Sequence, residues 1–173
     1  MTQASILSAF LLVCALGAPL AMAEDGAEVV DTEYQPHKAV IEFYFEDPRH
    51  INGALFWLRS LINTANAEPY GYSPDEHDIK VVIHGTEIVT LAQKNYDRYK
   101  EAVERMRYYS EFGVEFKVCG QAAHDFDYTP EDFHDFVQVI PSAMNEIIHW
   151  QEQGYGLLIP RVLTKRFSTE EIR

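Results

Sequence analysis

The stretch that decides the fold is Val114-Glu115-Phe116-Lys117-Val118-Cys119-Gly120. Its apolar side chains alternate with charged ones, which is the period-2 pattern of a short β-strand. The strand runs into Cys119, and a glycine and a polar segment follow. Because chemistry in an open α/β sheet gathers outside the carboxyl ends of the strands, we expect Cys119 to lie at the rim where a site would form. A lone cysteine after an apolar strand is also commonly a small buried hydrophobe, so a structural role for this thiol stays open.

Further strands and helices are predicted on both sides of this stretch. Segments rich in β-branched and aromatic residues predict four more strands, at 38–45, 78–85, 137–141 and 156–160. Apolar residues at helical spacing predict helices at 47–66, 97–112 and 142–154, with a short helix at 86–94 and one or two helical turns at 129–132. The segment 121–135 otherwise reads as short and irregular, and a capping box is predicted at Ser168 and Glu171. Five strands that alternate with helices predict an α/β fold, a mainly parallel five-stranded sheet with helices on both faces. One domain spans residues 38–160.

The N-terminus has the pattern of an export signal. Residues 6–20 are almost wholly apolar, and Ala21-Met22-Ala23 supplies a small-residue cleavage site. We therefore predict a cleaved signal peptide at residues 1–23 and a periplasmic or otherwise exported mature chain, with no membrane association after cleavage. Residues 24–37 are acidic and lack apolar periodicity, which indicates a flexible lead-in.

Charge and cysteine usage exclude several classes of partner. The formal net charge is −13, and residues 1–23 contribute none of it. Such a surface repels phosphate backbones and anionic lipid headgroups, so nucleic acid and membrane are not expected as partners. Cys14 would be lost with the signal peptide, which leaves Cys119 without an intramolecular disulfide partner. An unpaired cysteine in an oxidising compartment is used, buried or protected in an oligomer.

Two predicted strands end in residues that can carry chemistry. His84-Gly85 follows one strand and Cys119-Gly120 follows the next. A nearby imidazolium or helix N-terminal amides would favour the thiolate, which is the nucleophilic form of cysteine. We therefore take Cys119 and His84 as candidate catalytic residues. Gly85 and Gly120 are the candidate substrate-binding positions, since a glycine permits a turn that aims N–H groups at the sulfur. A histidine satisfied by backbone groups at the sheet edge is the structural alternative for His84.

A metal site is not predicted. The segment after Cys119 holds a cluster of potential ligands: His124, Asp125, Asp127, Asp132, His134 and Asp135. Their spacing matches neither a zinc pattern nor the loop of an EF-hand, and most of them also suit helix caps and solvated surface. The chain lacks G-x-S-x-G, C-x-x-C, P-loop and G-x-G-x-x-G patterns, so no motif supports a serine hydrolase, a thioredoxin-type oxidoreductase or a nucleotide enzyme. No cofactor is expected.

Four pieces taken together have a familiar order and spacing: Val81 to Gly85, Gly113 to Gly120, Val137 to Pro141, and Gln153 to Gly156. This combination resembles the DsrE/DsrF-like family, in particular its small exported single-domain members. The resemblance implies a three-layer α/β/α fold, assembly into trimers or hexamers, and sulfur transfer through a persulfide on the cysteine that matches Cys119. His84 falls where many members of this subgroup have a histidine.

Two features depart from the family pattern. His124-Asp125-Phe126-Asp127 stands in the loop where relatives often have a basic Arg-Gly pair, so an anionic ligand would be less welcome. The tail, residues 161–173, extends past the usual end of the family and has no family role that we can assign.

The leading hypothesis is an exported sulfur carrier or sulfurtransferase that loads a persulfide on Cys119 and passes the sulfur to an acceptor thiol. A sulfur donor or acceptor protein is then the expected partner beside the homo-oligomer. The first alternative is a non-catalytic oligomeric binding module in which Cys119 is structural. The second alternative is metal handling through His84, Cys119 and His124.

Overall fold

Five strands form one sheet in which all neighbouring pairs are parallel, as predicted. The strands are β1 (Lys38–Phe43), β2 (Asp78–Ile83), β3 (Glu115–Cys119), β4 (Val137–Ile140) and β5 (Gly156–Leu158). Their order in the sheet is β4-β3-β2-β1-β5. The computed structural model describes residues 26–30 and 32–173, so the predicted signal peptide lies outside the described residues. Residues 33–173 group into one unit.

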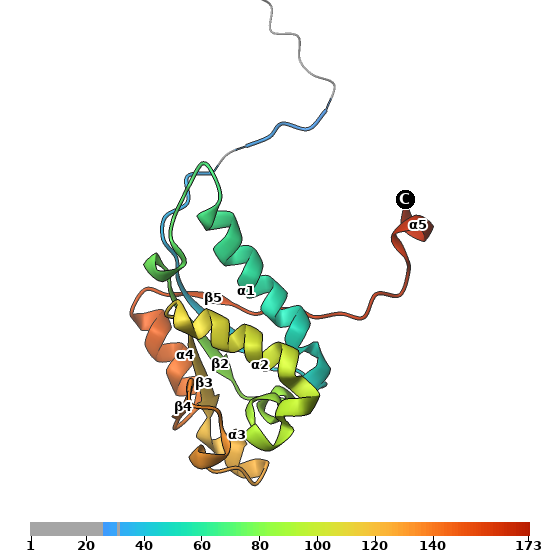
Figure 1. The fold of residues 1–173 in the computed structure, drawn as a ribbon. Coiled ribbons are helices and arrows are strands. Elements are labelled where there is room, and N and C mark those ends of the chain that lie inside the picture. The colour runs from blue at the N-terminus through green and yellow to red at the C-terminus, as the bar shows by residue number, and fades with distance from the viewer. Residues whose placement is uncertain (1–25, 31) are drawn as a thin grey trace, which may run out of the picture. The chain divides into compact units, whose positions relative to one another are not determined.

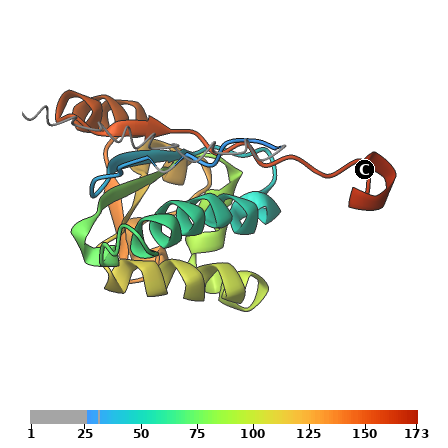
Figure 2. The ribbon, with the colours of Figure 1, turned by 90° about the horizontal axis from the view of Figure 1, so that it is seen from above.

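Helices cover both faces of the sheet (Figures 1 and 2). The long helices are α1 (Ile51–Asn66), α2 (Tyr96–Glu111) and α4 (Ala143–Glu152). The chain moves in one direction across the sheet from β1 to β4, so right-handed crossovers place α1 and α2 on the same face. The return from β4 to β5 runs the other way, which places α4 on the opposite face. The predicted three-layer α/β/α architecture is therefore confirmed.

Local sequence explains where the first long helix starts. Asp47 accepts a hydrogen bond from the backbone N–H of Arg49 at 2.9 Å, and Pro48 occupies the first position of a short 3₁₀ turn (η1, Pro48–His50) that leads into α1. Ile51, Leu55 and other apolar residues along α1 are fully buried. The helix predicted from Asp47 to Asn66 thus forms, with a 3₁₀ first turn.

Several short elements complete the chain. The 3₁₀ helices are η2 (Pro74–Glu76), η3 (Thr86–Leu91), η4 (Gln93–Asn95) and η5 (Pro130–Asp132), and the short α-helices are α3 (Gly120–Asp125) and α5 (Thr169–Ile172). The predicted irregular character of the segment that follows Cys119 is wrong at its start, because α3 begins at once after β3. Ala122 and Ala123 favour helix, and Ala123 is buried on the main core. Within the described residues no helix is long and apolar enough to span a membrane.

The sheet has a large apolar core on one face and a smaller one on the other. The large core lies between the sheet and the helices α1 and α2, and it contains Phe43, Phe116 and Ile83. The smaller core lies under α4 and consists of Val40, Val82, Cys119, Ile140, Ala143, Ile147 and Tyr155. The side chain of Cys119 therefore points toward α4.

Specific contacts form at both ends of residues 33–173. In the predicted lead-in, the ring of Tyr34 contacts the ring of Tyr70 in a tilted arrangement, with 5.0 Å between ring centroids. The backbone N–H of His37 donates to Nδ1 of His77 at 2.9 Å. These contacts lie at the end of the predicted lead-in, next to the first strand. At the other end the predicted capping box forms, since the Ser168 hydroxyl accepts from the backbone N–H of Glu171 at 3.3 Å.

Candidate functional site

Cys119 ends β3 and is buried, with 5% of its surface exposed. The backbone N–H of Ala143 donates a hydrogen bond to its Sγ at 3.3 Å. Ala143 is the first residue of α4, so the sulfur lies at the N-terminal end of a helix of ten residues. Helix N-termini carry unpaired N–H groups and the positive end of the helix dipole, and both stabilise negative charge on a sulfur.

The turn between β4 and α4 creates this contact. Cys119 pairs with Ile140 in the parallel register, and α4 begins three residues after Ile140. The sequence-based expectation that the Gly120 turn supplies the amide is therefore wrong, since the donor comes from Ala143. Gly120 has another role. A Cβ at this position would lie 3.0 Å from the carbonyl oxygen of Ile140, so glycine permits the close approach of the chain after β3 to β4.

His84 follows the last residue of β2 and is held by a carboxylate. Its Nε2 lies 2.9 Å from Oε1 of Glu42 in β1, and its ring stacks on Tyr44 with 4.8 Å between centroids. The alternative in which backbone groups satisfy this imidazole is therefore not what the structure shows. Sequence reasoning missed Glu42 and Tyr44. Their alternation with buried Val40 along β1 places them on the α4 face, and this signal was available.

Cys119 and His84 occupy neighbouring positions on one face of the sheet. Ile83 pairs with Val118, so the next residue of each strand, His84 and Cys119, stands one step further along the same register. Neighbouring strands lie about 4.8 Å apart. Within the described residues no hydrogen bond joins the two side chains, because Glu42 engages His84 and Ala143 engages Cys119. The arrangement brings a thiol, an imidazole and an orienting carboxylate to one rim.

A buried carboxylate holds the loop next to His84. Glu87 is fully buried, and its two oxygens accept hydrogen bonds from the backbone N–H of Phe45 at 3.0 Å and of Gly85 at 2.8 Å. Burial raises the pKa of Glu87, although the N–H donors act in the opposite direction. A Cβ at Gly85 would lie 2.6 Å from Oε2 of Glu87 and 2.7 Å from the Phe45 nitrogen. Gly85 is thus required for close packing, and sequence reasoning missed Glu87.

A cavity of about 460 Å³ opens at the carboxyl ends of β1 and β2. The residues that line it are Tyr44, Phe45, Glu46, His84, Gly85, Thr86, Ala122, Asp125 and Phe126. It therefore combines aromatic side chains with His84 and two carboxylates, and no lysine or arginine lines it. Cys119 lies outside this lining, one strand away from His84. A pocket of this composition disfavours small anions.

Three of the six potential metal ligands after Cys119 have other roles. Asp132 accepts from the backbone N–H of Thr129 at 2.8 Å, and Asp135 pairs with Arg107 at 2.7 Å. The ring of His134 stacks on Phe136. Across residues 26–30 and 32–173, no group of three or more His, Cys, Asp and Glu side chains is placed to hold a metal ion.

A layer of charge with two buried lysines, Lys80 and Lys117, lies between the sheet and α4. Lys117 Nζ lies 2.9 Å from Oε2 of Glu115 and 3.3 Å from Oε1 of Glu146 on α4, and Lys80 also pairs with Glu115. Both lysine ammonium groups lie over the ring of Trp150, at 4.7 Å for Lys80 and 5.7 Å for Lys117. This layer, made of these five residues, anchors the middle of α4. It therefore positions the helix whose first amide contacts Cys119.

The comparisons with known proteins agree with this architecture. A family model described as the DsrE/DsrF-like family matches residues 49–160. A solved structure of a protein of unknown function from Methanobacterium thermoautotrophicum is 19% identical, covers 72% of this chain and 99% of its own, and superposes with a TM-score of 0.57. A second one, from Bacteroides thetaiotaomicron and also of unknown function, is 10% identical, covers 71% of this chain and 94% of its own, and has a TM-score of 0.49. No curated protein matches significantly. The first likeness supports the fold.

Proposed function

Because the chain belongs to the DsrE/DsrF-like family, we propose that it is a sulfur carrier that holds sulfane sulfur as a persulfide on Cys119. The observation that supports this most directly is the contact at the start of α4. The sulfur of Cys119 accepts a hydrogen bond from the first amide of that helix, on the face of the sheet that it shares with His84. This contact holds the sulfur in place at a helix N-terminus, and the thiolate is the form of cysteine that attacks sulfane sulfur.

The proposed step exchanges one sulfur–sulfur bond for another. The Cys119 thiolate attacks the outer sulfur of a donor persulfide, R–S–SH. A new bond forms between the two sulfurs while the S–S bond of the donor breaks. The electron pair leaves with the donor thiolate, and the proton stays on the transferred sulfur. Transfer to an acceptor thiolate repeats the exchange, so neither half needs an external oxidant or reductant.

His84 and Glu42 support the charge changes of this exchange. The carboxylate of Glu42, 2.9 Å from Nε2, orients the imidazole at the rim. In general, an imidazolium close to a cysteine favours the thiolate, which is the attacking form in this exchange. The adjoining cavity, with its aromatic residues and carboxylates, would receive the donor or acceptor group that approaches the rim.

Intact-mass spectrometry before and after exposure to polysulfide tests this proposal. The expected result is a gain of one sulfur atom, about 32 Da, that reductant removes. The measurement uses the chain that begins at Glu24, in which Cys119 is the only cysteine of the sequence, and the gain should disappear in Cys119→Ser. Persistence of the gain in Cys119→Ser, or no gain in the native protein, would contradict the proposal.

One observation favours a second candidate, the binding module in which Cys119 is structural. The side chain is buried in the smaller core beside Ile140 and Ile147. Thiol titration with a small reagent separates the two candidates. Reaction in the native protein at a rate close to that of the denatured protein supports the carrier, and reaction that is fast only in denaturant supports the binding module.

We further propose that the chain is exported and that it acts as a homo-oligomer with a donor or acceptor protein. The small-residue site at Ala21-Met22-Ala23 predicts that the mature chain begins at Glu24. The mass of the chain recovered from the producing cell tests cleavage there. A retained residue 1 would contradict export by this route.

A further inference from the structure

The last thirteen residues of the chain, 161–173, form an arm that exposes large apolar side chains. Leu163 is 83% exposed, Phe167 is 62% exposed and Ile172 is 70% exposed. Three exposed apolar residues within one short segment are more than an ordinary surface carries without a use. The arm also lies beyond the region that matches the family, which ends at residue 160. The arm thus lies outside the part of the chain that the family model matches.

The start of the arm is fixed on the domain. A Cβ at Gly53 in α1 would lie 2.6 Å from Cγ1 of Val162, so the missing side chain of the glycine leaves room for this valine. Val162 packs on the large core. From this anchor the arm runs past the start of α1 and away from the sheet (Figure 1). The exposed residues after Val162 thus have no partner surface on their own domain.

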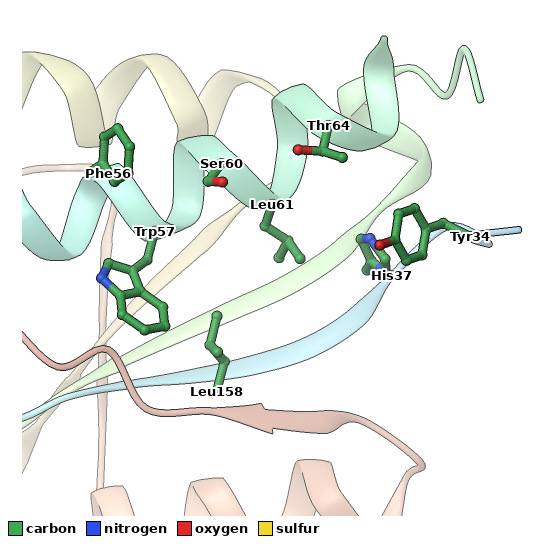
Figure 3. A pocket seen from close by; sticks show the side chains of 8 residues that line it. All are labelled: Tyr34, His37, Phe56, Trp57, Ser60, Leu61, Thr64 and Leu158. Carbon is green, nitrogen blue, oxygen red and sulfur yellow. The ribbon is translucent and has the colours of Figure 1, made fainter. Parts of the chain in front are cut away.

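An apolar groove lies between α1 and the edge strand β5 (Figure 3). Its volume is about 450 Å³, and its lining residues are Tyr34, His37, Phe56, Trp57, Ser60, Leu61, Thr64 and Leu158. Trp57, Leu61 and Leu158 converge in it (Figure 3), and none of the lining side chains is a carboxylate, lysine or arginine. Phe56 and Trp57 are 53% and 39% exposed. The groove can therefore accept further apolar side chains.

The groove of the same domain is poorly placed for its own arm. Leu158 lies in the groove, and the chain then runs four residues along α1 toward its start, where Val162 meets Gly53. The arm continues from there in the direction that leads away from the groove (Figure 1). To reach the groove of its own domain, the arm would have to reverse its direction after Val162. It can reach the groove of another copy without such a reversal.

Charge also favours docking of the arm on the acidic body of this fold. Four of the 14 basic residues of the chain and two of its 27 acidic residues lie in the arm, so the arm carries +2 and the rest of the chain carries −15. Opposite net charges attract the arm of one copy to the body of another, and salt screens this attraction.

We propose that the arm of one copy docks in the α1–β5 groove of a second copy, with Phe167 as the main apolar contact. Each copy has one arm and one groove, so mutual exchange closes as a pair or a ring. The surface is separate from the Cys119 rim, and the proposal does not depend on sulfur transfer.

Sedimentation velocity on the full chain tests the proposal. The variant Leu163→Ser/Phe167→Ser/Ile172→Ser changes only exposed side chains, so its fold should be retained. The expected result is an assembled wild-type chain and a variant of lower mass at the same concentration. The matched control Val29→Ser/Val30→Ser also removes exposed apolar side chains, at 88% and 72% exposure, and should leave the assembly intact. A monomeric wild-type chain, or equal loss of assembly in both variants, would overturn the proposal.

A labelled peptide of residues 161–173 then identifies the acceptor surface. In fluorescence anisotropy the peptide should bind the triple-serine variant, whose groove is unoccupied, at least tenfold more tightly than the wild type. Phe56→Ser or Trp57→Ser in the same background should abolish this binding, and higher salt should weaken it. The absence of binding, or binding that neither groove substitution changes, would refute docking in this groove.

Discussion

Replacing Glu87 by alanine should destabilise the domain and loosen the rim that carries His84. The carboxylate is fully buried and receives the backbone N–H groups of Phe45 and Gly85 on separate oxygens, at 3.0 and 2.8 Å. Alanine leaves both donors buried without a partner, and each unpaired N–H costs about 1–3 kcal/mol. Removal of a charge that is costly to bury offsets part of this sum. We expect a net loss of roughly 2–4 kcal/mol in the free energy of unfolding.

Urea denaturation provides the assay. A loss of about 3 kcal/mol with an m-value of about 2 kcal/mol/M lowers the midpoint by about 1.5 M. Glu101→Ala is the matched control, because this glutamate is exposed on α2 and its removal should change the midpoint little. If Glu87→Ala shifts the midpoint no more than the control does, the carboxylate does not hold the ends of β1 and β2 together, and the reasoning fails.

The pH dependence of this difference has a definite sign. Burial raises the pKa of Glu87 above its ordinary 4.5, so the fold favours the protonated form of this group. The stability that the group contributes is fully present below pH 4.5 and declines as the pH rises through the raised pKa. The difference between the wild type and Glu87→Ala should therefore be larger at pH 5 than at pH 8. A difference that grows with rising pH would contradict the assignment.

Two further predictions concern backbone packing and acid sensitivity. Gly85→Ala should destabilise the fold because its Cβ would lie 2.6 Å from Oε2 of Glu87. Gly156→Ala should be tolerated, since the nearest atom to its Cβ would lie at 3.9 Å. Equal thermal midpoints for the two variants would refute the close-packing argument. Burial lowers the pKa of both His77 and His134, and Nε2 of each ring is buried without a hydrogen-bond partner, so the fold favours their neutral forms. The free energy of unfolding should be constant above pH 6.5 and fall as the pH drops below it. Replacing both histidines by glutamine should reduce the change of the urea midpoint between pH 7 and pH 5. If the midpoint of this variant changes with pH as much as that of the wild type, the two histidines are not the cause of the acid sensitivity.

The sequence predicted the sheet well because its strands carry strong local patterns. The run from Lys38 to Phe43 is dense in β-branched and aromatic residues, and the alternation before Cys119 placed that thiol at a strand end. These signals are local, since they depend on propensity and period alone. The start of α4 was also predicted from a local pattern, because Ser142 precedes apolar residues at helical spacing.

The contacts of the site needed information that no local pattern contains. The pair of Glu42 and His84 joins residues that lie 42 positions apart, and it forms because β1 and β2 are neighbours in register. Glu87 reads as an ordinary polar residue of a short helix, and only the approach of Phe45 makes it a buried acceptor. The helix after Cys119 was missed because its six residues give too short a window for helical periodicity.

The charged layer under α4 has a consequence for the kinetics of Cys119. On α4, the ion pair of Glu146 with Lys117 and the contact of the Trp150 ring with the same lysine add to the apolar contact that Ile147 makes with the smaller core. Elements with few buried apolar contacts open locally at a lower free energy than the whole domain. A reagent can reach the thiol during such openings, so the observed labelling rate equals the opening equilibrium constant multiplied by the intrinsic rate of the exposed thiol. The labelling rate of Cys119 therefore reports the local opening of α4. This rate should rise as added salt screens the ion pairs.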